Sequence, residues 1–169
     1  MCKKKNQDLF IMESKIIIIG KSGSGKDYLK QKFVKRGFKP AIYYTTRPMR
    51  EGEHDGKEYF FIQRTEFEEL IKNKDLKEWN EFNGWFYGLE TREFMQSDVF
   101  IMPPEGLAQL SKEDRKKTLV IYLDIADHVR KERLIDRTDV SDLERRMSAD
   151  AESFEGFDNY DIRITDSNF

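Results

Sequence analysis

A glycine-rich segment near the start of the chain has the residue types and the spacing of a phosphate-binding loop. The segment reads Gly20-Lys21-Ser22-Gly23-Ser24-Gly25-Lys26-Asp27. In the pattern G-x-x-x-x-G-K, the glycines let successive backbone N–H groups face an anion, and Lys26 would reach the β and γ phosphates of a nucleoside triphosphate. We therefore expect this segment to bind a triphosphate.

The elements on either side of this loop are those that a phosphate-binding loop requires. Residues 16–19 are consecutive isoleucines, which is typical of a strand buried on both faces. Residues 28–33 are compatible with a helix, whose N-terminal dipole would attract phosphate. The alternative, a glycine-rich turn that binds nothing, does not account for this agreement of strand, loop and helix.

Asp27 occupies the last position of the loop motif, where a Ser or Thr hydroxyl normally meets Mg2+. A hard cation accepts carboxylate oxygens, so one hypothesis is that Asp27 orders Mg2+ directly or through waters. The alternative is a salt bridge from Asp27 to Lys26 or to another neighbour, and the sequence leaves both open.

Composition limits the classes of partner. The 169 residues suit one domain, and the charged residues, 37 % of the chain, nearly cancel to a net charge of -2. One cysteine, Cys2, and two histidines argue against a disulfide framework and a Cys/His metal site. No apolar run approaches the roughly 20 residues that span a bilayer. We expect a soluble cytoplasmic protein with no membrane or nucleic-acid partner.

Strand-like runs alternate with helix-compatible stretches, which predicts an α/β fold with a parallel sheet core flanked by helices. We expect further strands at residues 41–44, 59–62, 99–102, 119–123 and 161–165, and a hairpin of residues 76–82 and 85–87 that turns at Asn83-Gly84. We expect helices capped by Thr65 and by Thr91, a helix through Leu107 and Leu110, and helices at residues 126–134 and 141–153. A strand-rich insertion interrupts the pattern between about residues 45 and 90.

A second group of side chains could bind another phosphate. Arg47 and Arg50 flank Pro48, which keeps the backbone extended, so two guanidinium groups can converge on one dianion. Tyr59 and Tyr87 could each add a hydroxyl donor. Each residue alone has an ordinary alternative, a solvated arginine or a packed tyrosine. Together they indicate a phosphate pocket separate from the loop.

Taken in order, these segments resemble the guanylate kinase family, whose members move a phosphoryl group from ATP to GMP. The resemblance covers residues 16–168, and its most specific segments are Thr45-Thr46-Arg47-Pro48-Met49-Arg50-Glu51-Gly52-Glu53, Asp55-Gly56-Lys57-Glu58-Tyr59, Glu78-Trp79, Phe86-Tyr87-Gly88, and Arg133-Leu134 with Arg146. It implies the P-loop NTPase fold in a single domain, residues 1–169. The expected parts are a core (14–44, 90–134 and 143–169), an insertion that binds the nucleoside monophosphate (about 45–89) and a helical lid (about 135–142).

The resemblance implies roles for residues of the acceptor half of the site. Arg47, Arg50, Tyr59 and Tyr87 would hold the phosphate of the acceptor monophosphate. Glu78 would read the guanine edge by accepting hydrogen bonds from its ring N–H and exocyclic amine, a role that suits an acceptor-only group.

The resemblance also implies roles in the donor half. Arg133, Arg137 and Arg146 match lid arginines that close over the ATP phosphates and, with Lys26, Arg47 and Mg2+, stabilise the transferring group. Arg133 and Arg146 also suit solvated helix faces. Asp166 is the nearest match to an adenine-contacting Asn, and would complete an ATP site formed by residues 20–27 of the loop.

Three departures from the family affect the base pocket and the metal. Tyr43 stands in place of a Ser that contacts the base, and Leu89 replaces a Ser or Thr after Tyr87-Gly88. The acidic cluster at a strand end is replaced by Ile101-Met102-Pro103-Pro104, which is why Asp27 becomes a candidate for the magnesium role. Base discrimination would rest on fewer polar contacts.

The sequence therefore predicts an ATP-dependent nucleoside monophosphate kinase that phosphorylates GMP or dGMP by direct in-line transfer with Mg2+. One alternative is a kinase for ribose 1,5-bisphosphate or for a broader set of deoxynucleotides, because Gly-Ser-Gly-Lys-Asp resembles their loops. Another is a catalytically silent guanylate-kinase-like binding module. Small-molecule nucleotides are the expected partners, and monomer and homodimer are both open.

Overall fold

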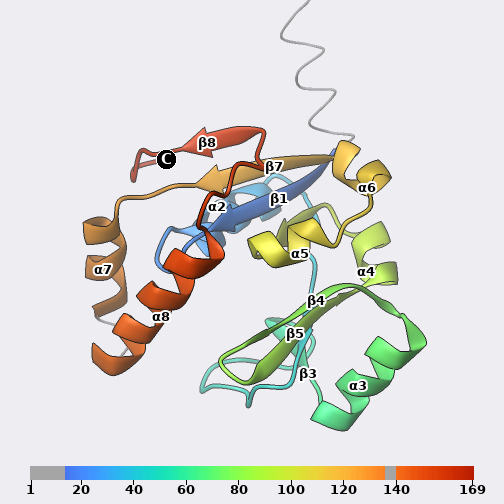
Figure 1. Ribbon diagram of the computed structural model, residues 1–169. Coiled ribbons are helices and arrows are strands. Elements are labelled where there is room, and N and C mark those ends of the chain that lie inside the picture. Colours follow the sequence, from blue (N-terminus) through green and yellow to red (C-terminus); the bar gives the residue numbers. More distant parts are fainter. Residues whose placement is uncertain (1–13, 136–139) are drawn as a thin grey trace, which may run out of the picture.

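The computed structural model describes residues 14–135 and 140–169, which form two four-stranded sheets with helices packed around them (Figure 1). The first sheet has the order β6-β1-β7-β8, and all of its strands are parallel. Its strands are β6 (Val99–Ile101), β1 (Lys15–Gly20), β7 (Thr118–Leu123) and β8 (Ile162–Ile164). The predicted α/β fold with a parallel core sheet is confirmed.

The first sheet is covered on both faces, as the isoleucine run predicts. Successive residues of β1 point to opposite faces, so Ile17 and Ile19 pack into one apolar cluster while Ile16 and Ile18 pack into the other. All four side chains are inaccessible to solvent. The apolar pattern of a strand buried in this way fixes its register with the neighbouring strands. In that register, Gly20 at the end of β1 lies beside Leu123 of β7.

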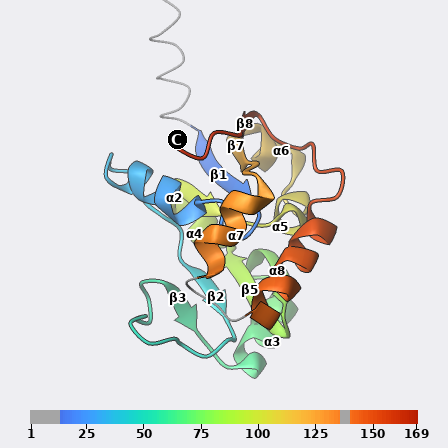
Figure 2. The ribbon, with the colours of Figure 1, turned by 90° about the vertical axis from the view of Figure 1, so that its left-hand side faces the viewer.

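Helices close these two clusters. The helices around the first sheet are α2 (Lys26–Val34), α4 (Thr91–Gln96), α5 (Pro104–Ala108), α6 (Lys112–Lys116), α7 (Asp127–Ile135) and α8 (Val140–Ser153). Leu107 of α5 belongs to the cluster with Ile17, whereas Leu29 of α2 belongs to the cluster with Ile16. Figure 1 and Figure 2 show α7 and α8 side by side. Within the described ranges, none of the helices is long and apolar enough to cross a membrane.

The second sheet has the order β3-β2-β5-β4 and carries helix α3 (Arg64–Asn73). Its strands are β2 (Tyr43–Thr45), β3 (Tyr59–Phe61), β4 (Leu76–Phe82) and β5 (Trp85–Glu90). Strands β2 and β3 are parallel, and β5 runs antiparallel to both β2 and β4. The hairpin of β4 and β5 turns at Asn83 and Gly84, both with positive φ, as predicted.

Two helix starts differ from the prediction. Gln63, not Thr65, is the N-cap of α3, because its backbone N–H donates to the Glu66 carboxylate at 2.7 Å. Glu90, not Thr91, is the N-cap of α4, and Thr91 is the first helical residue. In both cases a threonine in the first turn resembles a cap in sequence, while the backbone bends one or two residues earlier.

Candidate active site

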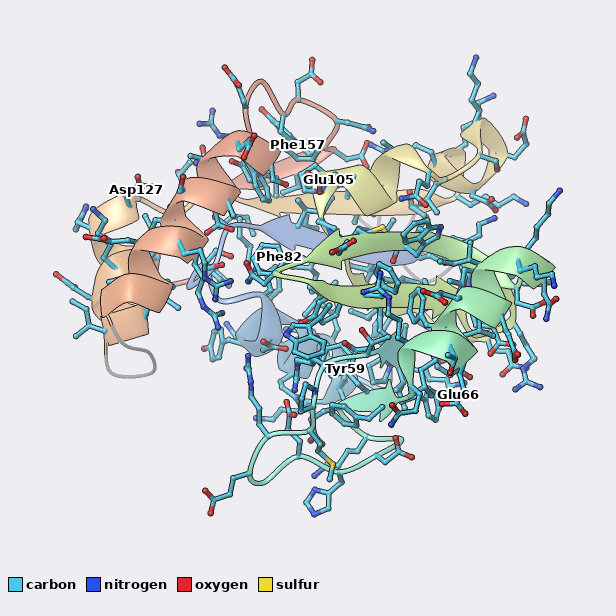
Figure 3. The ribbon with its side chains drawn as sticks, turned by 60° about the horizontal axis from the view of Figure 1, so that its bottom comes forward. Tyr59, Glu66, Phe82, Glu105, Asp127 and Phe157 are labelled. Atoms are coloured by element: carbon cyan, nitrogen blue, oxygen red, sulfur yellow. The ribbon has the colours of Figure 1, made fainter. Side chains whose placement is uncertain are left out.

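A cavity of about 810 Å3 lies between the phosphate loop, the second sheet and helices α5 and α8. Figure 3 labels three of the side chains that line it, Tyr59 of β3, Phe82 of β4 and Glu105 of α5. The cavity is also lined by most of the residues that the sequence proposes for the two phosphate sites and the base: Gly20, Lys26, Asp27, Tyr43, Arg47, Arg50, Tyr59, Glu78 and Tyr87. Segments far apart in the chain thus meet around one space.

The phosphate loop is shaped by its glycines. Gly23 and Gly25 have φ of 76° and 97°, a conformation that other residues rarely adopt. At Gly20 a Cβ would lie 2.6 Å from the Ser24 hydroxyl and 2.9 Å from the Leu123 carbonyl, so only glycine fits beside β7. The Leu29 N–H donates to the Gly25 carbonyl at 3.0 Å, and helix α2 begins at the loop as predicted.

Lys26 is folded back onto the loop. Its ammonium donates to the carbonyls of Gly20 at 2.6 Å and Lys21 at 3.1 Å. Burial lowers the pKa of Lys26 below its ordinary value, and the carboxylates of Asp150 and Asp27 act in the opposite direction. The charged group is therefore held at the edge of the cavity, next to the N–H groups of the loop.

Asp27 lies in the first turn of α2 and faces the cavity. Its side chain is 84 % exposed, and its carboxylate is 2.9 Å from the Lys30 ammonium. The salt bridge to a neighbour that the sequence allowed is therefore present. The carboxylate is also accessible beside Lys26, so it fits a hydrated hard cation. Among the described residues, no three His, Cys, Asp or Glu side chains gather to hold a metal.

Arg47 is held in place by Glu53. Its guanidinium is 8 % exposed and makes two bonds to the Glu53 carboxylate, at 2.6 Å and 2.7 Å. The Arg50 N–H also donates to Glu53, at 2.8 Å. These bonds keep the pKa of Glu53 at about 2. The Arg47 guanidinium lies 5.0 Å from the centre of the Tyr59 ring, so the arginine is fixed on two sides.

The two tyrosines join the arginines in the same cavity. Tyr59 pairs with Tyr43 across β3 and β2, and Tyr87 pairs with Thr45 across β5 and β2. The centres of the Tyr59 and Tyr87 rings are 5.9 Å apart. Burial raises the pKa of Tyr59 to about 12, so its hydroxyl keeps its proton and can donate it in a hydrogen bond.

Glu78 and Tyr43 form the deeper part of the cavity. Glu78 is 2 % exposed, and burial raises the pKa of its carboxyl to about 8. Gly106 of α5 packs against it so closely that a Cβ there would lie 2.5 Å from Glu78 Oε2. The Tyr43 hydroxyl is buried and has no hydrogen-bond partner among the described residues. A buried carboxyl and a buried free hydroxyl suit a polar ligand edge.

Of the residues predicted for the lid and the adenine site, one lines a cavity and the others described do not. Arg146 lines a smaller cavity of about 290 Å3 together with Arg47, Arg50 and Tyr87. Arg133 donates to the carbonyls of Gly23, Ser24 and Ser167 and does not line either of these cavities. Asp166 is exposed and accepts the Asn168 N–H at 2.8 Å. Arg137 lies outside the described residues.

Glu53, Arg130 and Asp150 hold other site residues in place and were not predicted from the sequence. Arg130 and Asp150 contact Ser22 of the phosphate loop. A signal for Arg130 was available, because it lies four residues before Leu134 on the face of the helix expected to be buried, where a charged residue is unusual. The sequence contains no comparable signal for Asp150 or for the hydrogen bonds between Glu53 and Arg47.

A solved structure of another protein has the same fold as this chain. The structure of a guanylate kinase from Anaplasma phagocytophilum superposes with a TM-score of 0.66 at 22 % identity, over 92 % of this chain and 80 % of that one. The sheet order, the glycine-rich loop and this similarity define a P-loop NTPase fold.

The family follows from the sequence matches. The Guanylate kinase family profile matches residues 12–169. A guanylate kinase of Bacillus cereus is 34 % identical over 160 residues, 88 % of this chain and 78 % of the relative. One of Bacillus subtilis (strain 168) is 31 % identical over 164 residues, 90 % of this chain and 80 % of the relative. The chain belongs to the guanylate kinase family.

Proposed function

We propose that this protein transfers the γ-phosphoryl group of ATP to GMP or dGMP directly, with no covalent intermediate. The observation that carries the proposal is the meeting, around one cavity, of Lys26 in a phosphate-binding loop, the Arg47 and Arg50 pair, and the buried carboxyl of Glu78. A donor site and an acceptor site in one cavity allow in-line transfer, which depends on alignment and charge rather than on a protein nucleophile.

The donor half would bind ATP through backbone and ammonium groups. Loop N–H groups and the N-terminus of α2 would hold the phosphates. Lys26 would exchange its bonds to the Gly20 and Lys21 carbonyls for bonds to the β and γ phosphates. The donor group would then meet cations without rearrangement of the loop itself.

The acceptor half would hold the monophosphate through charged and hydroxyl donors. Arg47, fixed by Glu53, would present the free side of its guanidinium to the phosphate, and Arg50 would add a second charge. The hydroxyls of Tyr59 and Tyr87 would donate to the remaining oxygens. Because the guanidinium is already positioned, little ordering is needed when the acceptor binds.

Glu78 would select the base. An ionised carboxylate accepts two hydrogen bonds, and guanine offers two adjacent donors, its ring N–H and its exocyclic amine. The Tyr43 hydroxyl, which has no partner among the described residues, could donate to an acceptor of the same base. A base without both donors would not offset the cost of ionising this buried carboxyl, whose pKa is raised to about 8.

Magnesium would be held mainly by the ATP phosphates, with Asp27 as the protein group that meets it directly or through waters. The accessible Asp27 carboxylate beside Lys26 supports this assignment. The metal would supply positive charge to the transferring phosphoryl group.

Arg146 would add charge beside the acceptor phosphate, since it shares a cavity with Arg47 and Arg50. We also propose that Arg133 and Arg137 act at the donor end. In the structure Arg133 bonds to loop carbonyls, so its phosphate contact would require a new orientation of its side chain. The division into a core, an insertion of about residues 45–89 and a lid of about residues 135–142 is part of the same proposal.

A coupled phosphoryl-transfer assay tests the function. ATP and Mg2+ would be supplied with each nucleoside monophosphate, each deoxynucleoside monophosphate and ribose 1,5-bisphosphate. We expect turnover of GMP and dGMP far above that of the other acceptors. Turnover of the sugar phosphate alone, or ATP binding without turnover of any acceptor, would overturn the proposal.

A further inference from the structure

Ser22 of the phosphate loop forms hydrogen bonds with two residues that lie far from the loop in sequence. Its N–H donates to Asp150 Oδ2 at 2.8 Å, and its hydroxyl donates to Asp150 Oδ1 at 3.2 Å. Arg130 Nη1 donates to the Ser22 carbonyl at 2.9 Å. Arg130 lies 108 positions along the chain, on α7, and Asp150 lies 128 positions along, on α8. Both peptide groups that flank Ser22 are therefore bound.

Arg130 and Asp150 are a buried ion pair. Their exposed fractions are 1 % and 8 %, and Arg130 Nη1 donates to Asp150 Oδ2 at 3.2 Å. Arg130 Nη2 also donates to Asp127 at 2.7 Å. Apolar side chains of similar size usually stabilise helix packing at least as well as a buried ion pair, since charges lose hydration when they are buried. Beyond their pairing with each other and with Asp127, these charges contribute their hydrogen bonds to Ser22.

Helix α7 also blocks movement of the loop at the next residue. Gly23 lies against the helix so closely that a Cβ would be 2.7 Å from the Arg130 carbonyl. Arg133, one turn further along α7, donates to the Gly23 carbonyl at 3.2 Å. Figure 2 shows α7 beside the first sheet with α8 next to it. The outer side of the loop is therefore fixed from Ser22 to Gly23.

We propose that Arg130 and Asp150 are positioning residues for the phosphoryl donor. By binding the Ser22 peptide groups and hydroxyl, they keep the loop in the shape that presents the following N–H groups to a triphosphate, before the nucleotide arrives. Arg130 places a positive charge against Asp150 next to the donor site, and it shares that charge with the exposed Asp127. The inference rests on the proposed function only in that ATP binds at this loop.

The decisive variant replaces both charges together, Arg130→Met with Asp150→Leu. Removing both avoids an unpaired buried charge, so the fold should persist. Measured by isothermal titration without acceptor, the dissociation constant of ATP should rise about tenfold, as expected for loss of one hydrogen bond to a charged group. The KM of GMP should stay within about twofold. A folded double variant that binds ATP as the wild type does would overturn the inference.

A second measurement needs no variant. In nucleotide-free wild-type protein, the Ser22 amide should be protected from hydrogen exchange, because Asp150 accepts its proton. Exchange at the rate of an unstructured peptide would contradict the proposal, whatever the stability of the double variant.

Arg115→Met is the matched control. It removes a 3.0 Å ion pair with Asp161, away from the residues that line the cavity. ATP affinity should not change in this variant. If it fell as much as in the double variant, removal of any ion pair would have the same effect, and the inference would be overturned. If the wild type binds ATP but phosphorylates no acceptor, the proposed function fails while the comparison of ATP affinities still decides the positioning role.

Discussion

The donor half of the cavity is formed mainly by backbone groups, whereas the acceptor half is formed by side chains. The phosphate loop of the donor half is one continuous segment whose groups are mostly backbone, shaped by glycines and placed by the end of β1. The acceptor half is an assembly of side chains from separate strands and loops of the second sheet, such as Arg47, Tyr59, Glu78 and Tyr87. A backbone site can bind any triphosphate, whereas a side-chain site can recognise one acceptor. Substitutions in the donor half should therefore reduce the rate of phosphoryl transfer, whereas substitutions in the acceptor half should reduce binding and recognition of the acceptor.

The largest loss should follow Lys26→Met. The ammonium is the one side-chain cation of the phosphate loop placed to meet the transferring group, so kcat should fall about 10³-fold, as for removal of a main charge-stabilising donor. Steady-state kinetics with ATP and GMP measure this. Circular dichroism should show an unchanged fold, and a loss below tenfold would remove the distinction between the two halves.

Arg47→Lys should damage the acceptor half alone. Lysine keeps the charge but cannot bind the Glu53 carboxylate and a phosphate with one planar group. We expect kcat/KM for GMP to fall about 30-fold, within the range for loss of hydrogen bonds between charged groups, with ATP affinity unchanged. Lys57→Met offers a control, because that exposed lysine pairs only loosely with Glu58, at 3.7 Å. An equal loss of ATP affinity in Arg47→Lys would argue against separate halves.

Glu78 should make acceptor binding dependent on pH. The pKa of about 8 means that the carboxyl is protonated at neutral pH in the empty site, and it must lose its proton to accept both guanine donors. The KM of GMP should therefore fall about tenfold for each pH unit from 6 towards 8 and then level off.

Glu78→Gln is the matching variant. An amide does not titrate, so the pH dependence of the KM of GMP should disappear, and the KM should rise because one acceptor oxygen becomes a donor. A profile that persists in this variant would assign the titration to another group.

The smallest change should follow Asp27→Asn. If Asp27 meets Mg2+ while the ATP phosphates hold most of its coordination sphere, the magnesium concentration for half-maximal rate should rise several-fold, with little change in kcat at saturation. A magnesium titration of the initial rate measures this. The same curve for wild type and variant would reduce Asp27 to the partner of Lys30.

The phosphate loop and the strand and helix that flank it could be predicted from sequence almost residue by residue. The chemistry of the loop depends on the spacing of glycines within eight consecutive positions, between a buried strand and a helix, and the structure confirms that setting. In the acceptor half, Arg47, Arg50, Tyr59 and Tyr87 could be grouped by residue type as a second phosphate pocket. Glu78 and Tyr43 could be named only through the resemblance, because the meeting of these side chains depends on pairings between strands that no local pattern reveals.

The supporting residues were the hardest to foresee. Asp150 meets Ser22 only because α8 packs next to α7, and Glu53 acts through a turn that brings it back to Arg47. The orientation of Arg133 is a third case, since its guanidinium bonds to the loop carbonyls and does not line the cavity. Sequence gives the type of residue in each case, while the direction of the side chain follows from tertiary packing.

Binding of a linked ligand shows whether the donor and acceptor halves belong to one cavity. Adenosine and guanosine joined by five phosphates should occupy the loop and the Arg47 pocket at once. Isothermal titration should give one site per chain and a dissociation constant at least about 100-fold below that of ATP or GMP alone, because the second contact becomes intramolecular. An affinity equal to that of ATP, with GMP still able to bind the complex, would show that the two halves do not form one continuous site.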